Sequence, residues 1–425
     1  MRKLVLLLLC LSATPAFAQD TPPISLTEAF TEADAQNPQL IAARRTLDLS
    51  QADITIAGAI PNPQIAAQYG FGSIFTEQGS SQQVGVSQTL ELGGKLPARL
   101  GLANSNYRLT QLQLSTLRWD IRAQVRRAYA ELAAAEAQSR SVDLQISLVQ
   151  RLVDIARKRF EAGASPEAEL LQAQLSRNQI DIQRTQALGR IQQARTQLTA
   201  LLGSSYQQEI AVKDKGLFDL SIDKTELVPK PDVPIPTLDA LLSQAYNQRL
   251  DLQATQQQQE VARQQLNLAQ ALRTPDLQVS AGYQFTTYTN GIARADGIFI
   301  GAGITVPIFY NQNGEVAKAQ ATIEQSALQS TALRALISTN VRTSYQALAT
   351  ARENIRKYQT QLIPNSRDVL SLAQESYQVG KTGLTSAIFA QQADQQIRSG
   401  YLDAVVAYQS AWADLERAVG APLAL

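Results

Sequence analysis

The segment LRWDIRAQVRRAYAELAAA, residues 117–135, carries the pattern that decides the fold. Its apolar residues recur every three or four positions, as in Leu117, Ile121 and Val125, which is the spacing of a coiled-coil seam. The segment belongs to a helical stretch of more than a hundred residues, 95–203, with one interior break at EAGASP, residues 161–166. A helix over 95–162 would be roughly 100 Å long at about 1.5 Å per residue. We therefore expect neighbouring helices to bury its seam along that length.

The first 18 residues have the features of a secretory signal. Arg2 and Lys3 precede an apolar run at 4–11, and Ala16-Phe17-Ala18 forms a small-residue cleavage site. The protein is therefore expected to be exported. Lipidation at Cys10 is disfavoured because this cysteine lies inside the apolar run, and the three leucines before it lack the small residues that such a site prefers.

Composition excludes several classes of function. The chain has no histidine, and removal of the signal would also remove its single methionine and its single cysteine. Soft and borderline metals require imidazole, thiol or thioether ligands, and Ser/His or Cys/His catalysis requires imidazole. The formal charge of +1, without a polybasic segment, does not indicate a nucleic-acid partner. We expect no catalytic residues, no cofactor and no resident metal.

Four segments alternate apolar and polar residues with the period of two that marks a half-buried strand, at about 64–75, 83–92, 277–287 and 297–307. One face suits lipid and the other a polar lumen, over about the 9 to 11 residues of a membrane strand. No stretch after the signal reaches the roughly 18 to 20 apolar residues of a spanning helix. A membrane crossing would therefore use strands.

Four strands cannot close a barrel, because about eight are the minimum, and an open edge in lipid leaves backbone groups unpaired. Chains must therefore pool their strands. Two chains would give a barrel filled by its own side chains, whereas three would give twelve strands and a lumen. The residues alone indicate a mixed α and β membrane protein with long antiparallel α-helical hairpins and four β-strands per chain, and a conducting barrel favours a trimer.

The second half of the chain copies the first at offsets of 212 to 217 residues, which indicates an internal repeat. The matched positions include Leu40 and Leu252, Pro63 and Pro275, Ile121 and Ile337, and Gly163 and Gly380. We expect a signal at 1–18, a first repeat at 19–203, a linker with little regular structure at 204–236 and a second repeat at 237–420. The first repeat would hold a helix at 24–60 interrupted near Asn37-Pro38, the first two strands, a long helix at 95–162 and a helix at 166–202. The second would hold a helix, the other two strands, a long helix at 314–379 and a helix at 384–419.

Several short motifs occur in a fixed order along these repeats: Asn37-Pro38, Pro61-Asn62-Pro63, QTLELGGK at 88–95, and VPIF at 306–309 followed by Asn313-Gly314-Glu315. In this order the chain resembles the TolC family of outer-membrane efflux proteins over residues 24–420, and LGGK at 92–95 is most similar to the heavy-metal efflux branch. The resemblance implies a homotrimer with a 12-stranded trimeric barrel in the outer membrane, continuous with a coiled-coil-like helical tunnel that extends into the periplasm. It also implies a periplasmic adaptor (membrane fusion) protein and an inner-membrane pump, of the RND or the ABC type.

The same resemblance places the two helix turns at the periplasmic tip. The turns would dock the adaptor through Arg159, Gly163, Ser165, Tyr377, Gly380, Lys381 and Thr382. The family often narrows its tip with acidic rings a few residues past each turn glycine. Glu169 stands six residues past Gly163 and fits this pattern, whereas Ser386 stands at the matching place after Gly380 and departs from it.

Three copies of Glu169 would form a cation-attracting ring, and Phe389 would add an apolar constriction. The alternative for these gate candidates is a solvated carboxylate and a phenylalanine packed in a helix seam. The turn glycines likewise suit any helix reversal, whatever docks there.

The sequence therefore predicts a passive exit duct of a tripartite efflux system for metal ions or small toxic compounds. A duct for ABC-driven type I protein secretion is the first alternative, because nothing in the chain specifies the cargo. A soluble periplasmic coiled-coil adaptor or scaffold is the second, but it leaves the four alternating strands unexplained.

Overall fold

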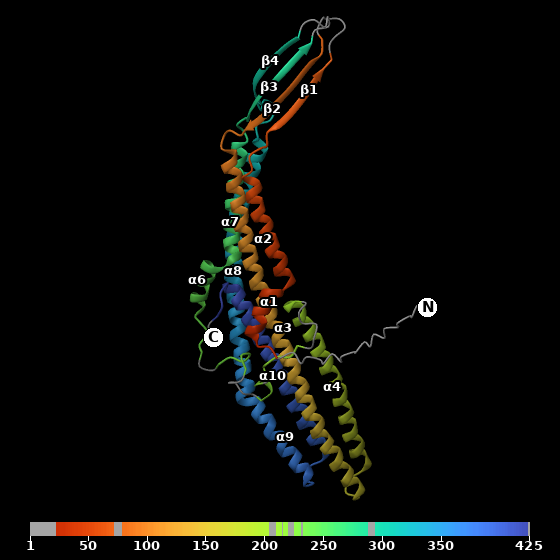
Figure 1. Cartoon of the computed structure of the whole chain (residues 1–425). Helices are drawn as coiled ribbons and strands as arrows, with labels where there is room; N and C mark the ends of the chain where they lie inside the picture. Colours follow the sequence, from red (N-terminus) through yellow and green to blue (C-terminus); the bar gives the residue numbers. More distant parts are fainter. Residues whose placement is uncertain are drawn as a thin grey trace, which may run out of the picture.

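The computed structural model describes residues 23–71, 79–203, 210–214, 216–219, 225–230, 233–287 and 294–423. The predicted signal at 1–18 lies outside these residues. The molecule is elongated, with a β-sheet at one end and long helices running away from it (Figure 1). None of the described helices combines the length and the apolar content needed to cross a membrane.

Each half of the chain supplies a pair of strands between helices. The elements of the first half are α1 (Leu26–Gln36), α2 (Pro38–Ala57), β1 (Gln64–Gly70), β2 (Ser81–Leu90), α3 (Lys95–Glu161) and α4 (Glu167–Leu202). Those of the second half are α6 (Leu238–Gln248), α7 (Leu250–Ala271), β3 (Leu277–Thr287), β4 (Arg294–Ile304), α8 (Asn313–Lys357), a π-helical turn (Tyr358–Leu362), α9 (Ile363–Gln378) and α10 (Leu384–Val419). The short helix α5 (Gly216–Asp219) lies between the halves.

Local side-chain chemistry sets the interruption between α1 and α2. Ser25 begins α1 with a capping box, in which the Glu28 N–H donates to Ser25 Oγ and the Ser25 N–H donates to Glu28 Oε2. Asn37 caps α2, because its Oδ1 accepts from the Gln39 N–H at 2.9 Å, while Pro38 occupies the first turn. The Asn37 side-chain amide also donates to the Leu201 carbonyl, so this break is tied to the end of α4.

The four strands form one antiparallel sheet in the order β1-β2-β3-β4. The register places Gln83 opposite Gln284, whose side-chain amides are hydrogen bonded at 2.9 Å. The other face carries apolar side chains such as Ile65 and Ile300, the latter 85% exposed. Among the described strands, β1 and β4 each have a neighbour on one side only.

The strand ends differ from those expected. Strand β1 ends at Gly70 instead of near residue 75, and residues 72–78 lie outside the described part. Strand β4 ends at Ile304, before Pro307, which has no N–H to donate to a ladder. Alternation identified the faces correctly, but it does not mark where pairing stops.

The long helix expected at 314–379 is interrupted. Its path is α8, the π-helical turn and then α9, which bends away from the line of α8 (Figure 1). Pro364 explains the break, because proline cannot donate to the preceding turn and its ring displaces the carbonyl four residues earlier. A wider π turn immediately before α9 accommodates that carbonyl.

The linker expected at 204–236 contributes to the core. Ile24 and Val212 form an isolated β-bridge, and Leu217 and Leu227 are buried. Gln409 on α10 donates to the Leu227 carbonyl at 2.8 Å. The prolines prevent regular structure in this segment, but the apolar residues between them still bury their side chains against α3 and α10.

A buried ion pair lies in the main core beside this linker. The Arg126 guanidinium is 3.3 Å from Glu416 Oε2 and donates to Gln409 Oε1 at 3.1 Å. It also lies over the ring of Trp412, 4.9 Å from its centroid. Because Glu416 accepts from the Leu423 N–H, the pair connects α3 to the end of the chain.

Towards the sheet, α2, α3, α7 and α8 form a row in which each helix packs on the next (Figure 1). The chain enters α3 from β2 through Gly93 and Gly94, both with φ near +74°. Lys95, almost completely buried, forms a 2.7 Å ion pair with Asp276 at the start of β3. This contact joins the two halves where the sheet meets the helices.

Candidate functional site

The end of the molecule opposite the sheet is made by two helix turns with the same hydrogen bonds. After α3, the Gly163 N–H donates to the Phe160 carbonyl and the Ala164 N–H to the Arg159 carbonyl. After α9, the Gly380 N–H donates to the Tyr377 carbonyl and the Lys381 N–H to the Ser376 carbonyl. Both are Schellman motifs, and both require a positive φ at the glycine, +69° and +77°.

Arg159 connects the two turns. Its Nη1 donates to the carbonyl oxygen of Tyr377 at 3.2 Å, and its guanidinium carbon lies 5.2 Å from the centroid of the Tyr377 ring. Tyr377 itself is 0% exposed. It packs in a separate lower core that includes Leu152, Ala173 and Leu384 and so draws on α3, α4 and α10. The two hairpins are therefore joined near their tips by this apolar core and by the contact of Arg159 with Tyr377.

Glu169, in the first turn of α4, faces the same cluster. Burial raises the pKa of Tyr377, the Glu169 carboxylate raises it further, and the Arg159 cation opposes this shift. Among the described residues, four buried polar atoms of the tip have no hydrogen-bond partner: Arg159 Nε, Ser165 Oγ, Glu169 Oε2 and Tyr377 OH. Buried polar atoms without a partner cost free energy.

The other expected residues of the tip lie on its surface. Gly163, Gly380, Lys381, Thr382 and Ser386 are exposed. Phe389, in the second turn of α10, is 65% exposed. The expectation that Tyr377 belongs to a docking surface differs from the structure, because its side chain is buried beneath Arg159. Nothing in the sequence pattern signalled this contact, because its partners lie 218 residues apart.

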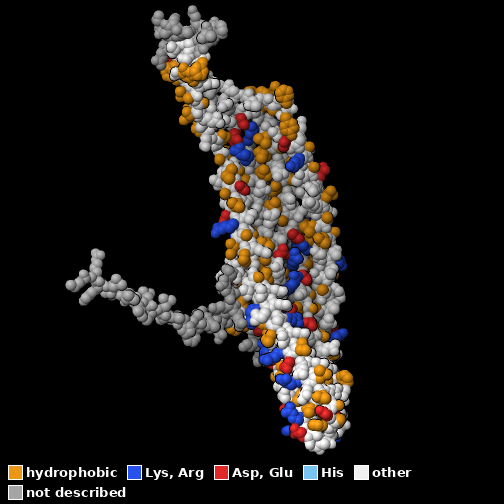
Figure 2. Space-filling model, turned by 90° about the vertical axis from the view of Figure 1, so that its right-hand side faces the viewer, with side chains coloured by type: hydrophobic (Ala, Val, Ile, Leu, Met, Phe, Trp, Pro, Cys, Tyr) orange, Lys and Arg blue, Asp and Glu red, His pale blue; other side chains and the backbone are white. Residues whose placement is uncertain are grey.

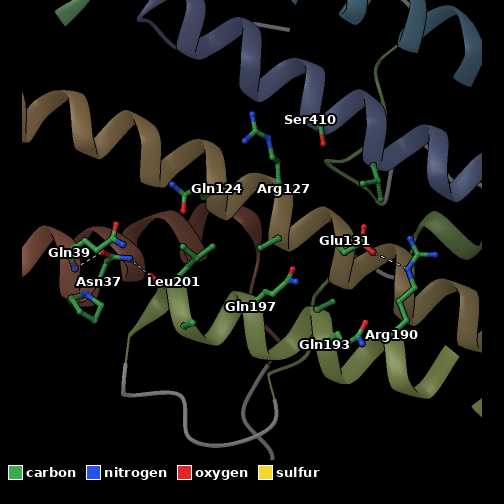
Figure 3. A pocket seen from close by; sticks show the side chains of 15 residues that line it. Asn37, Gln39, Gln124, Arg127, Glu131, Arg190, Gln193, Gln197, Leu201 and Ser410 are labelled. Carbon is green, nitrogen blue, oxygen red and sulfur yellow. Dashed lines mark hydrogen bonds and ion pairs between the residues drawn. The ribbon is translucent and has the colours of Figure 1, made fainter. Parts of the chain in front are cut away.

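A large open groove lies nearer the middle of the molecule (Figure 3). Its volume is about 860 Å³, and it is formed by the start of α2 with α3, α4 and α10. Arg190 on α4 forms a 2.9 Å ion pair with Glu131 on α3, while Gln124, Gln193 and Gln197 line the walls. The sequence did not indicate this groove, because four separate segments line it; Asn37-Pro38 was singled out only as a motif and a helix interruption.

Neither region has an arrangement that indicates chemistry. In the part of the chain that the structure describes, no group of three or more metal-ligating side chains is placed to hold an ion. Arg190 and Glu131 of the groove are paired with each other, and Arg127 is paired with Asp414 on α10. Arg159 at the tip is hydrogen bonded to the backbone of the other hairpin. The side chains of the two regions hold helices together and offer surfaces for contact with other proteins.

Comparison with known proteins gives the family. A family model described as "Outer membrane efflux protein" matches residues 29–204 and 241–421, which covers both repeats. The chain belongs to this family of outer membrane efflux proteins. The outer-membrane location expected from the sequence is confirmed by this membership.

Two curated relatives are similar over much of the chain. The cobalt-zinc-cadmium resistance protein CzcC of Cupriavidus metallidurans is 24% identical over 410 residues, covering 96% of this chain and 93% of the relative. The outer membrane protein TolC of Vibrio cholerae is 23% identical over 300 residues, covering 68% and 66%. The family resemblance seen in the sequence is therefore confirmed.

Solved structures match the fold. CusC superposes with a TM-score of 0.73 at 19% identity, covering 96% of both chains. The open state of the Neisseria gonorrhoeae MtrE outer membrane channel gives a TM-score of 0.69 at 18% identity, covering 93% of this chain and 89% of that one. The expected fold class, long helical hairpins with a four-stranded contribution to a barrel, is confirmed.

Proposed function

We propose that this protein is the passive exit duct of a tripartite efflux system. In this role the sheet lies in the outer membrane and the helices extend into the periplasm. One observation carries the proposal: the elongated molecule has two different ends. One end is a sheet with an apolar face and open edges, and the other is a tip made of two helix turns. The first end suits lipid and the second a protein contact.

The sheet supports a homotrimer. Strands β1 and β4 expose unpaired backbone groups, which lipid cannot satisfy, so strands from other chains must pair with them. Three chains give twelve strands, enough for a barrel with a lumen. The helices below would then enclose a tunnel continuous with that barrel.

The substrates we propose are metal ions or small toxic compounds. Support comes from the names of two relatives, the cobalt-zinc-cadmium resistance protein CzcC and the nickel-cobalt-cadmium resistance protein NccC. An inner-membrane pump of the RND type would supply the energy. Substrates would reach the duct through a periplasmic adaptor docked at the exposed parts of the two turns, which include Gly163, Gly380, Lys381 and Thr382.

The tip is also the proposed gate. Glu169 would supply an acidic ring, which favours cations at a constriction, and the exposed Phe389 would supply an apolar one. Ser386 leaves the second repeat without a matching acid. A gate of this kind would hold cations mainly through three carboxylates.

Deletion of the gene tests this function. We expect increased susceptibility to some members of a panel of metals and drugs, restored by the wild-type gene, with the set of secreted proteins unchanged. A secretion defect with unchanged susceptibility would replace the proposal with ABC-driven protein export. Recovery of the protein as a soluble periplasmic species would replace it with an adaptor or scaffold.

A further inference from the structure

A pocket of about 420 Å³ lies between α1 and α3, next to the break between α1 and α2. This break lies midway between the sheet and the tip (Figure 1), and acidic and basic side chains gather midway along the side that carries α2 and α4 (Figure 2). The floor of the pocket is apolar and buried, with Ala33, Leu40 and Ile121. Its rim carries polar and aromatic side chains: Phe30, Thr31, Asp34, Arg118, Trp119 and Arg122. The pocket therefore combines an apolar floor with a charged rim.

Arg122 is held in this rim by aromatic rings and not by an acid. Its guanidinium carbon lies 4.3 Å from the centroid of the Phe30 ring and 5.7 Å from that of the Trp119 ring. Its Nε is buried, and no described residue accepts a hydrogen bond from it. An aromatic ring attracts the charge but offers no oxygen to the guanidinium N–H groups. Arg122 therefore has donors available for a bound anion.

The one carboxylate of the rim is already occupied. Asp34 accepts from Arg118 Nε at 2.8 Å and from Arg118 Nη2 at 2.9 Å, which is a bidentate pair. Its Oδ1 also lies 3.6 Å from Arg44 Nη2 on α2. Arg126, one turn further along α3, has its own acidic partner in the core. Among the described residues, Arg44, Arg118 and Arg122 thus share one carboxylate, and Arg122 is the cation that it does not reach.

The second repeat builds the same floor without this chemistry. At offsets of 212 and 216 residues the floor residues match Ala245, Leu252 and Ile337, which are identical in type and also buried. The rim differs, because the counterparts of Phe30, Asp34, Trp119 and Arg122 are Leu242, Tyr246, Ala335 and Ser338. Helix α6 still packs on α8, as α1 packs on α3. Helix packing therefore requires neither the free cation nor the two rings of the first repeat.

We infer that this pocket binds the carboxylate of a small organic acid with an aromatic or apolar body. The Arg122 guanidinium donates to the carboxylate, while the rings of Phe30 and Trp119 and the apolar floor contact the body of the ligand. One free guanidinium matches one negative charge, so a monoanion fits better than a doubly charged phosphate. The pocket volume lies within the range of small-molecule sites, about 300–1,000 Å³.

The height of the pocket excludes lipid as the source of the anion. Helix α3 begins at Lys95, so Arg122 lies roughly 40 Å along it at about 1.5 Å per residue. With the sheet in the outer membrane, lipid headgroups extend less than about 10 Å beyond the hydrocarbon core. The ligand is therefore a soluble acid of the periplasm. This placement rests on the proposed duct, whereas the site itself rests on the pocket and is independent of what the duct exports.

Fluorescence of Trp119 tests the inference in the purified mature protein, held in lipid nanodiscs. The chain has two tryptophans, so Trp412→Phe leaves Trp119 as the only one and keeps a ring beneath Arg126. The probe is 4-bromobenzoate, whose bromine quenches a tryptophan that it contacts, and its neutral match is 4-bromobenzamide. We expect saturable quenching by the acid and only weak, unsaturable quenching by the amide.

Arg122→Ser introduces the residue that the second repeat has at this place. In the Trp412→Phe background it should weaken binding of the acid about tenfold or more, which is the loss expected when a charge-assisted hydrogen bond is removed. The matched control is Arg157→Ser, because Arg157 is an exposed arginine on the same helix and does not line the pocket. This control should bind the acid as tightly as the parent protein.

Three results would overturn the inference. Equal quenching by the acid and the amide would show that the charge is not recognised, and unchanged affinity in Arg122→Ser would show that another group holds the acid. Absence of saturable quenching by the acid would show that there is no site. The comparison of acid and amide uses no variant of the pocket rim, so it decides the inference even where Arg122→Ser does not fold. None of these results bears on export, which the gene deletion tests.

Discussion

Replacement of Arg159 by methionine should loosen the tip while leaving the fold intact. The substitution removes the hydrogen bond to the Tyr377 carbonyl and the cation above the Tyr377 ring. A hydrogen bond from a charged group contributes about 1.5–3 kcal/mol, and a cation–π contact at an exposed site about 0.5–1 kcal/mol. Because Arg159 is partly exposed, we take about 2 kcal/mol for the sum, which corresponds to roughly a 30-fold shift towards separated hairpins.

Conductance in planar bilayers measures this shift. The Arg159→Met protein should show a higher open probability than the wild type, and Arg159→Lys should fall between them because it keeps the charge. Arg157→Met is the matched control, because Arg157 lies on the same helix turn but is exposed. Equal conductance of Arg159→Met and the wild type, in channels of normal stability, would refute the role of this link.

Three further predictions concern stability. Arg126→Met should lower the free energy of unfolding by about 3–5 kcal/mol, because it leaves the Glu416 carboxylate buried and unpaired. Adding Glu416→Leu should restore most of the lost Tm. An equal loss of Tm in the single and the double variant would contradict this role. Gly380→Ala should cost about 1–2 kcal/mol because its φ is +77°, whereas Gly189→Ala, inside α4 with open space around it, should raise the Tm. The hydrogen bond from Lys213 holds the pKa of Glu28 at about 2, below its ordinary 4.5. The ionised Glu28 therefore stabilises the fold above pH 4.5, and this stabilisation is lost as the pH falls towards 2. Glu28→Gln should therefore flatten the dependence of Tm on pH in that window, and an unchanged slope would exclude this role.

The features that the sequence predicts well are those that repeat. The three-and-four spacing from Leu117 onward and the turn glycines Gly163 and Gly380 locate the helices and their reversals, because both depend on local backbone geometry. Alternation likewise identifies the two faces of each strand, since side chains along a strand point to opposite sides.

Contacts between distant segments were not predictable. The link from Arg159 to Tyr377 and the ion pair of Lys95 with Asp276 each depend on how the two repeats come together, which no local pattern encodes. The prolines of the linker at 204–236 predict little regular structure, but they did not indicate that Leu227 is completely buried. Proline limits hydrogen bonding in a segment, but it does not prevent the burial of neighbouring apolar side chains.

The π-helical turn before α9 is a feature that apolar periodicity within one segment does not predict. Apolar periodicity continues through residues 358–362, so the pattern alone favours one uninterrupted helix. The two repeats differ at the position of the break. The second repeat has Pro364, whereas the matching residue of the first repeat is Leu148, which is compatible with a straight helix. Comparing the two repeats position by position would have located the interruption.

The state of the mature protein in cell fractions tests the proposed outer-membrane duct most directly. A trimeric duct should be recovered in the outer membrane as an oligomer of three chains whose migration changes on heating, as expected when a closed barrel unfolds. A monomer in the soluble periplasmic fraction, with the same migration before and after heating, would contradict it.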